Sequence, residues 1–145
     1  MQTFLPLPSF AASAATLDRQ RLGKQRVENL QILQALAPGA KSRWRAHPAT
    51  RMWAGYEPAL VAYQDAVCSA WTAHGYKDTC WAKTLELANA CGWLDREIEM
   101  PPWFGSHLFH RSHQSNLIRK HPSWYGKMFP GVPDDLPYIW PVEES

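Results

Sequence analysis

The chain has 145 residues, of which 46% are hydrophobic and 19% are charged, and its formal net charge is +2. This composition is that of a folded domain with its own core, and it excludes a disordered chain. No apolar run reaches the roughly 18 residues of a membrane helix, and residues 1–15 lack the basic start of a signal peptide, so we expect a cytoplasmic protein without membrane contact.

The charges are distributed unevenly along the chain. Residues 1–77 hold nine Lys and Arg against four Asp and Glu, whereas residues 78–145 hold six against nine. Within the acidic half, the span 100–133 contains no carboxylate. Basic stretches without acids can contact phosphates, although a solvated surface with scattered charges explains these counts equally well.

The first half of the chain predicts an extended arm followed by a long helix. Residues 1–15 combine two prolines with an apolar bias, which is typical of an arm laid over the body of a domain. Residues 16–37 carry apolar side chains at helical spacing, with Ser13 or Thr16 as a possible N-cap and an end before Pro38. A basic loop that includes Arg45 follows.

The rest of the chain predicts further helices and no strands. Helical patterns cover residues 48–54, residues 57–74 before Gly75, residues 81–91 after a cap at Asp78 or Thr79, residues 106–120, and one more turn within 123–129. Four prolines between positions 130 and 141 predict an extended tail. The sequence therefore predicts one compact all-α domain over residues 1–145, with about four to five helices.

The long helix carries a carboxylate among cations. Arg21, Lys24 and Glu28 fall one or two turns apart, and neighbouring cations favour the ionised form of an acid. From this pattern alone, a surface ion pair with Lys24 explains Glu28 slightly better than catalysis. Arg26 and Asn29, however, fall on the apolar side of the same helix, where buried polar groups need partners. We therefore expect the helix to pass through a polar site in which Glu28 is the best catalytic candidate.

Other kinds of chemistry find less support in the sequence. His107, His110 and His113 have a spacing that could hold a metal, but no nearby carboxylate or thiol completes the set. The three cysteines are widely spaced, which favours reduced thiols over a disulfide framework or a zinc site. Common nucleophile, phosphate-loop and dinucleotide motifs are missing from the sequence. We expect neither a metal nor another cofactor.

The segment from Leu17 to Glu28 resembles the first helix of the phage pyrimidine-dimer DNA glycosylase family, also called endonuclease V. The residues that match this helix in register are Gln20, Arg21, Leu22 and Glu28. The helix end at residues 71–79 and the aromatic segment 122–127 are similar to two further segments of the family, in the same order. The three segments span about three quarters of the chain.

The resemblance implies a metal-free DNA glycosylase with an associated AP lyase activity on damaged double-stranded DNA. In this family the N-terminal amine attacks C1′ of the damaged nucleotide, and an essential Glu, which is Glu28 here, assists ring opening and elimination. The amine could belong to Met1, to a processed N-terminus or to Lys24, or Glu28 could activate water instead. Gln2 stands where the family has a small Thr and is expected to hinder removal of Met1. Val27 replaces the Arg that precedes the catalytic Glu in the family.

The resemblance and the charge pattern together suggest a set of DNA contacts on a monomeric protein. The candidates are Gln20, Arg21, Arg26, Arg45, His113, Arg119, Lys120, Trp124, Tyr125 and Lys127. Two other classes of function stay open: a non-catalytic nucleic-acid binding module that uses the same basic and aromatic surface, and an all-α protein-interaction domain.

Overall fold

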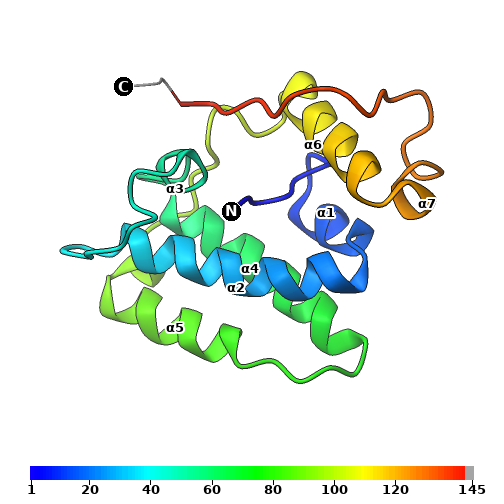
Figure 1. Ribbon diagram of the computed structural model, residues 1–145. Helices are drawn as coiled ribbons and strands as arrows, with labels where there is room; N and C mark the ends of the chain where they lie inside the picture. Colours follow the sequence, from blue (N-terminus) through cyan, green and yellow to red (C-terminus); the bar gives the residue numbers. More distant parts are fainter. Residues whose placement is uncertain (143–145) are drawn as a thin grey trace.

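The computed structural model describes residues 1–142, and every regular element in this range is helical. The helices are α1 (Phe10–Thr16), α2 (Arg19–Leu36), α3 (Pro48–Arg51), α4 (Glu57–Ala73), α5 (Cys80–Ala90), a 3-10 turn η1 (Trp93–Asp95), α6 (His107–Lys120) and α7 (Pro122–Tyr125). The predicted all-α class is confirmed (Figure 1). None of these helices has the length and apolar character needed to cross a membrane.

Helices α2, α4 and α5 pack side by side and form one part of the molecule (Figure 1). Leu22 and Leu33 of α2 and Leu60 and Tyr63 of α4 are almost completely buried in the hydrophobic core. Gly75 follows α4 with a φ of 87°, a left-handed conformation that glycine adopts without strain, and the helix ends there as the sequence predicts.

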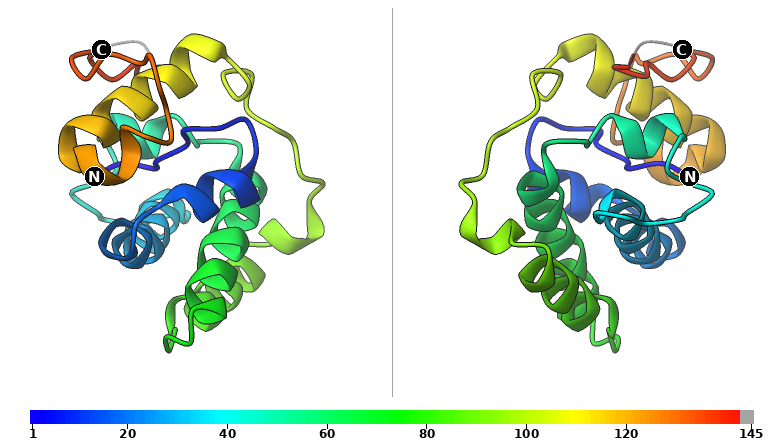
Figure 2. Two further views of the ribbon diagram at one scale, coloured as in Figure 1. Left: turned by 90° about the vertical axis from the view of Figure 1, so that its right-hand side faces the viewer. Right: turned by 90° about the vertical axis from the view of Figure 1, so that its left-hand side faces the viewer.

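Helix α6 lies across from α2 and α4, and the N-terminal arm runs between them (Figures 1 and 2). The tail after α7 passes back over α6 in an extended conformation, as expected from its prolines. The start of the chain is therefore enclosed by elements that are distant in sequence.

The extended part of the arm is shorter than predicted, because residues 10–16 form α1. This run is rich in alanine, which has the highest helix propensity, and the Ser9 side chain accepts a hydrogen bond from Ala12 N at 3.2 Å at the N-cap. The predicted caps of the long helix are also wrong. Asp18 occupies the N-cap of α2, whereas the Ser13 hydroxyl donates to Leu7 O.

The later helices begin and end close to the predicted positions. Asp78 caps α5, since its carboxylate accepts hydrogen bonds from Cys80 N at 3.1 Å and Trp81 N at 2.9 Å. The last helical turn covers Pro122–Tyr125 instead of residues 123–129.

Side chains from α1, α2, α4 and α6 bind the backbone of the arm almost residue by residue. Phe4 O accepts a hydrogen bond from the Tyr63 hydroxyl, and Pro6 O accepts one from Gln114 Nε2 at 2.8 Å. His113 Nδ1 accepts from Leu5 N at 3.0 Å, and His110 Nδ1 lies 2.7 Å from Leu5 O. Buried backbone N–H and C=O groups must be paired, and in a sheet a neighbouring strand would pair them. In this protein the side chains provide those hydrogen bonds to the arm.

We expect the stability of the protein to fall between pH 7 and pH 5 because of His113. Burial lowers the pKa of this histidine from 6.5 to about 3, so the unfolded chain binds a proton below pH 6.5 that the folded chain refuses. This difference in proton binding lowers the free energy of unfolding by roughly 2 kcal/mol between pH 7 and pH 5. Urea unfolding at both pH values measures it. His113→Asn retains an acceptor for Leu5 N and should show a smaller loss; an equal loss in both proteins would contradict the assignment.

Candidate active site

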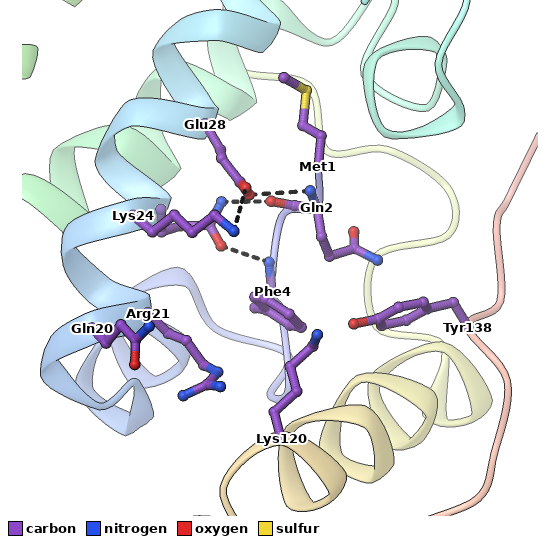
Figure 3. Close-up of a pocket in the computed structure, with 10 residues that line it drawn as sticks. Met1, Gln2, Phe4, Gln20, Arg21, Lys24, Glu28, Lys120 and Tyr138 are labelled. Atoms are coloured by element: carbon purple, nitrogen blue, oxygen red, sulfur yellow. Dashed lines mark hydrogen bonds and ion pairs between the residues drawn. The ribbon is translucent and has the colours of Figure 1, made fainter.

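Glu28 lies on the side of α2 that faces the start of the arm (Figure 3). Its Oε2 atom accepts a hydrogen bond from the backbone nitrogen of Gln2 at 3.1 Å, and its Oε1 atom lies 3.7 Å from Lys24 Nζ. The Glu28 side chain is only 12% exposed, whereas that of Lys24 is 72% exposed. The carboxylate therefore lies between a backbone nitrogen of the arm and an exposed cation.

A pocket of about 220 Å³ opens beside this carboxylate. Four parts of the chain contribute to its wall: the arm, α2, the end of α6 and the tail. The lining residues are Met1, Gln2, Phe4, Gln20, Arg21, Lys24, Gln25, Glu28, Lys120 and Tyr138. Three cations line the pocket with this one carboxylate: Lys24 lies beside Glu28, whereas Arg21, which pairs with Asp18 at 3.1 Å, and Lys120 lie toward its other end (Figure 3). Such a pocket suits an anionic ligand, because the cations offset its repulsion by the Glu28 carboxylate.

Tyr138 supplies an aromatic wall that the sequence analysis did not identify. Its ring packs at an angle against Phe4, with centroids 6.3 Å apart, and its hydroxyl points toward the pocket (Figure 3). Burial raises the pKa of Tyr138 to about 12, with Arg119 lowering it and Glu28 raising it further. The hydroxyl therefore stays protonated at neutral pH and can donate a hydrogen bond.

His47 is a second residue near the site that the sequence analysis left without a role. Its Nδ1 atom accepts a hydrogen bond from Ala49 N at 3.0 Å and so caps α3. Burial lowers the pKa of His47, the N-terminal ammonium lowers it further, and Glu28 opposes the shift. The imidazole is consequently neutral at pH 7, within electrostatic reach of both Met1 and Glu28.

An open cleft of about 510 Å³ lies on the neighbouring side of α2. Trp71 and Trp124 are its aromatic walls, and Gln20 and Lys24 line both the cleft and the pocket. Gly23 allows Trp71 to lie close against α2, because a Cβ atom at this position would approach the indole to 2.9 Å. The Trp124 side chain is 45% exposed and is anchored by a 2.9 Å hydrogen bond from Nε1 to Thr16 O.

The structure brings together most of the residues singled out in the sequence. Glu28, Met1 and Lys24 meet in the pocket with Gln20, Arg21 and Lys120, and Trp124 lines the adjoining cleft. The remaining exposed candidates line neither the pocket nor the cleft; they are Arg45, Arg119 and Lys127.

Two of the suggested DNA contacts are corrected by the structure, and a third is paired within the domain. His113 and Tyr125 are fully buried, where His113 binds the arm and the Tyr125 hydroxyl donates to Asp18. Arg26 lies against Trp71, with its guanidinium 4.5 Å from the ring centroid, and forms an ion pair with Asp78. A basic or aromatic residue type does not tell whether the side chain binds a partner inside the domain or faces solvent, which explains the two corrections.

Gln2, Phe4, Gln25 and Tyr138 are lining residues that the sequence analysis missed. A signal existed for Gln25, since it shares the apolar side of α2 with Asn29, and both are buried. No local signal existed for Tyr138, which reaches the pocket only because the tail folds back.

One of the comparisons with known proteins gives a match. A family model described as pyrimidine dimer DNA glycosylase matches residues 1–84, more than half of the chain. The match includes the arm and α2 with Lys24 and Glu28, and it ends before Lys120 and Tyr138. The searches of curated proteins and of solved structures gave no match.

Proposed function

Because the chain belongs to the pyrimidine dimer DNA glycosylase family, we propose that it excises a damaged or modified base from double-stranded DNA and then nicks the strand by an AP lyase step. The observation that supports this proposal best is the 3.1 Å contact between the nitrogen of residue 2 and Glu28 Oε2. It brings the start of the chain to the only carboxylate among the described residues that line the pocket.

In the proposed reaction, an amine at the start of the arm attacks C1′ of the damaged nucleotide. The bond to the base breaks, and the base leaves with the electron pair and takes up a proton. Glu28 accepts the proton that the amine loses and assists opening of the sugar ring to a Schiff base. Loss of a proton from C2′ then breaks the C3′–O bond and expels the 3′ phosphate. Water finally hydrolyses the Schiff base and releases the protein.

We assign the amine to the arm and not to Lys24. The Lys24 side chain is largely exposed and reaches Glu28 only at 3.7 Å, whereas the arm is held in place by buried hydrogen bonds. If Met1 is removed, the nitrogen of residue 2 becomes the terminal amine in contact with Glu28. If Met1 is retained, its amine is the nucleophile. An intact mass of the purified protein distinguishes the two forms.

The cations and aromatic residues around the pocket supply the proposed contacts to DNA. Arg21, Lys24 and Lys120 can bind backbone phosphates next to the reacting sugar. Trp124 exposes an indole face beside the pocket, and a base removed from the helix gains from such stacking.

Borohydride reduction is expected to trap the wild-type protein covalently on DNA that contains an abasic site. Acetylation of the terminal amine should abolish trapping, because an amide nitrogen is not nucleophilic. Lys24→Arg should retain trapping to within about tenfold, since it keeps the charge but loses the primary amine. Trapping that survives acetylation and disappears in Lys24→Arg would show that Lys24 is the nucleophile. Salt-sensitive DNA binding without any trapping or base excision would refute the enzyme and favour a binding module.

A further inference from the structure

We propose that Gln25 is a positioning residue that sets the start of the arm against Glu28; this inference rests on the proposed function. The side-chain amide of Gln25 binds the arm at two points. Its Nε2 atom donates to Gln2 O at 2.9 Å, and its Oε1 atom accepts from Phe4 N at 2.9 Å. One amide thus satisfies the two backbone groups that a neighbouring strand would otherwise bind.

Gln25 and Glu28 hold the same residue of the arm from the same helix. They are three positions apart on α2, so their side chains lie on one face. Glu28 binds the nitrogen of residue 2 and Gln25 binds its carbonyl oxygen. Since α2 is a regular helix of 18 residues, the separation of these two contacts is fixed.

The orientation of the Gln25 amide is fixed as well. Nε2 also donates to Asn29 Oδ1 at 2.8 Å, and both side chains are almost completely buried. Rotation of the amide by 180° would direct its oxygen at the oxygens of Gln2 and Asn29 and its N–H groups at Phe4 N. Only one arrangement satisfies all three contacts, so Gln25 holds the arm in a single register.

This register matters because an attacking amine must stand within reach of both the sugar carbon and its proton acceptor. A misplacement of about 1 Å can lower the rate of a positioned reaction roughly 100-fold. The other side chains that anchor the arm bind it farther along, from Thr3 to Pro6, and none of them binds the backbone of residue 2. Gln25 is therefore expected to affect the chemical step and not the affinity for DNA.

The test compares Gln25→Met with Gln114→Met under single-turnover conditions. Both substitutions keep the length of the side chain and remove amide contacts to the arm, but Gln114 binds it at Pro6. Three quantities are measured: the rate of borohydride trapping on abasic-site DNA as a function of pH, the Kd for a duplex with an uncleavable tetrahydrofuran site, and the Tm.

We expect Gln25→Met to trap about 10- to 100-fold more slowly, with a changed pH dependence and a Kd within about threefold of wild type. Gln114→Met should keep the wild-type rate and pH dependence to within about threefold. Gln25→Glu, which preserves the volume and places an oxygen opposite Gln2 O, provides a second variant and should be equally slow at pH 8.

A folded Gln25 variant that traps at the wild-type rate would overturn the inference. The inference would also be overturned if the trapping rates of both Met variants fell in proportion to the decrease in their Tm. A purely structural role lowers the folded fraction without changing the pH dependence of the trapping rate. If the wild-type protein itself fails to trap, the proposed function fails instead, so the two outcomes are distinguishable.

Discussion

Replacing Glu28 with Gln is expected to abolish strand nicking at abasic sites, with a rate at least about 100-fold below that of the wild-type protein. The amide keeps the size of the side chain and can still accept a hydrogen bond from Gln2 N, so the arm should stay in place. It cannot accept a proton from an attacking amine. The measurement is the single-turnover nicking rate of a duplex with one abasic site.

Glu86→Gln is the matched control for this substitution, because Glu86 is an exposed carboxylate on α5 that lines none of the pockets described above. It should nick at the wild-type rate. DNA affinity should be unchanged or slightly increased in Glu28→Gln, since one negative charge near the phosphates is lost. Nicking by Glu28→Gln at more than about a tenth of the wild-type rate would remove Glu28 from the proposed chemistry.

Replacing Asp78 with Ala is expected to lower the free energy of unfolding by about 3–5 kcal/mol. The Asp78 side chain is only 4% exposed, and although burial raises its pKa, hydrogen bonds from Trp81 N, Arg26 and Cys80 N lower it below its usual value. The carboxylate is thus charged, pairs with Arg26 and caps α5. Alanine would leave the partly buried guanidinium of Arg26 without its carboxylate partner and the start of α5 without its cap.

Urea unfolding measures this loss, with two variants for comparison. Asp78→Asn keeps an oxygen at the cap and should be less destabilising, and Asp65→Ala removes an exposed carboxylate and should cost less than about 0.5 kcal/mol.

Arg26→Met should also lose stability while retaining DNA affinity, whereas Lys120→Met should bind DNA more weakly. A selective loss of DNA binding in Arg26→Met would restore Arg26 as a DNA contact.

The arm shows how far sequence reasoning extends into the tertiary structure. Its prolines predict an extended start, but they do not reveal that residues 2–7 are enclosed between α2, α4 and α6. The side chains that enclose it are ordinary polar residues, such as Gln25 and Gln114, whose partners are backbone groups. Backbone groups are the same at every position, so the sequence does not tell which of them a buried polar side chain will bind.

The two corrected DNA contacts have a related cause. His113 and Tyr125 stand in a basic, aromatic part of the chain, and their composition favours a binding surface. In the folded protein they hold the arm and the first turn of α2 instead. Charge and aromaticity identify residues that need partners, but they do not tell whether the partner is DNA or the protein itself.

The sequence by itself determined the all-α class, most helix ends and the position of Glu28 on α2. These features depend on local rules: apolar spacing, glycine and proline at helix ends, and neighbours one turn apart. Only the tertiary structure decided that Glu28 faces the nitrogen of residue 2, that Lys120 and Tyr138 complete the pocket, and that Arg26 is paired with Asp78. Each of these contacts joins segments distant along the chain, and it forms because buried polar groups must find partners wherever the packing of the helices brings them.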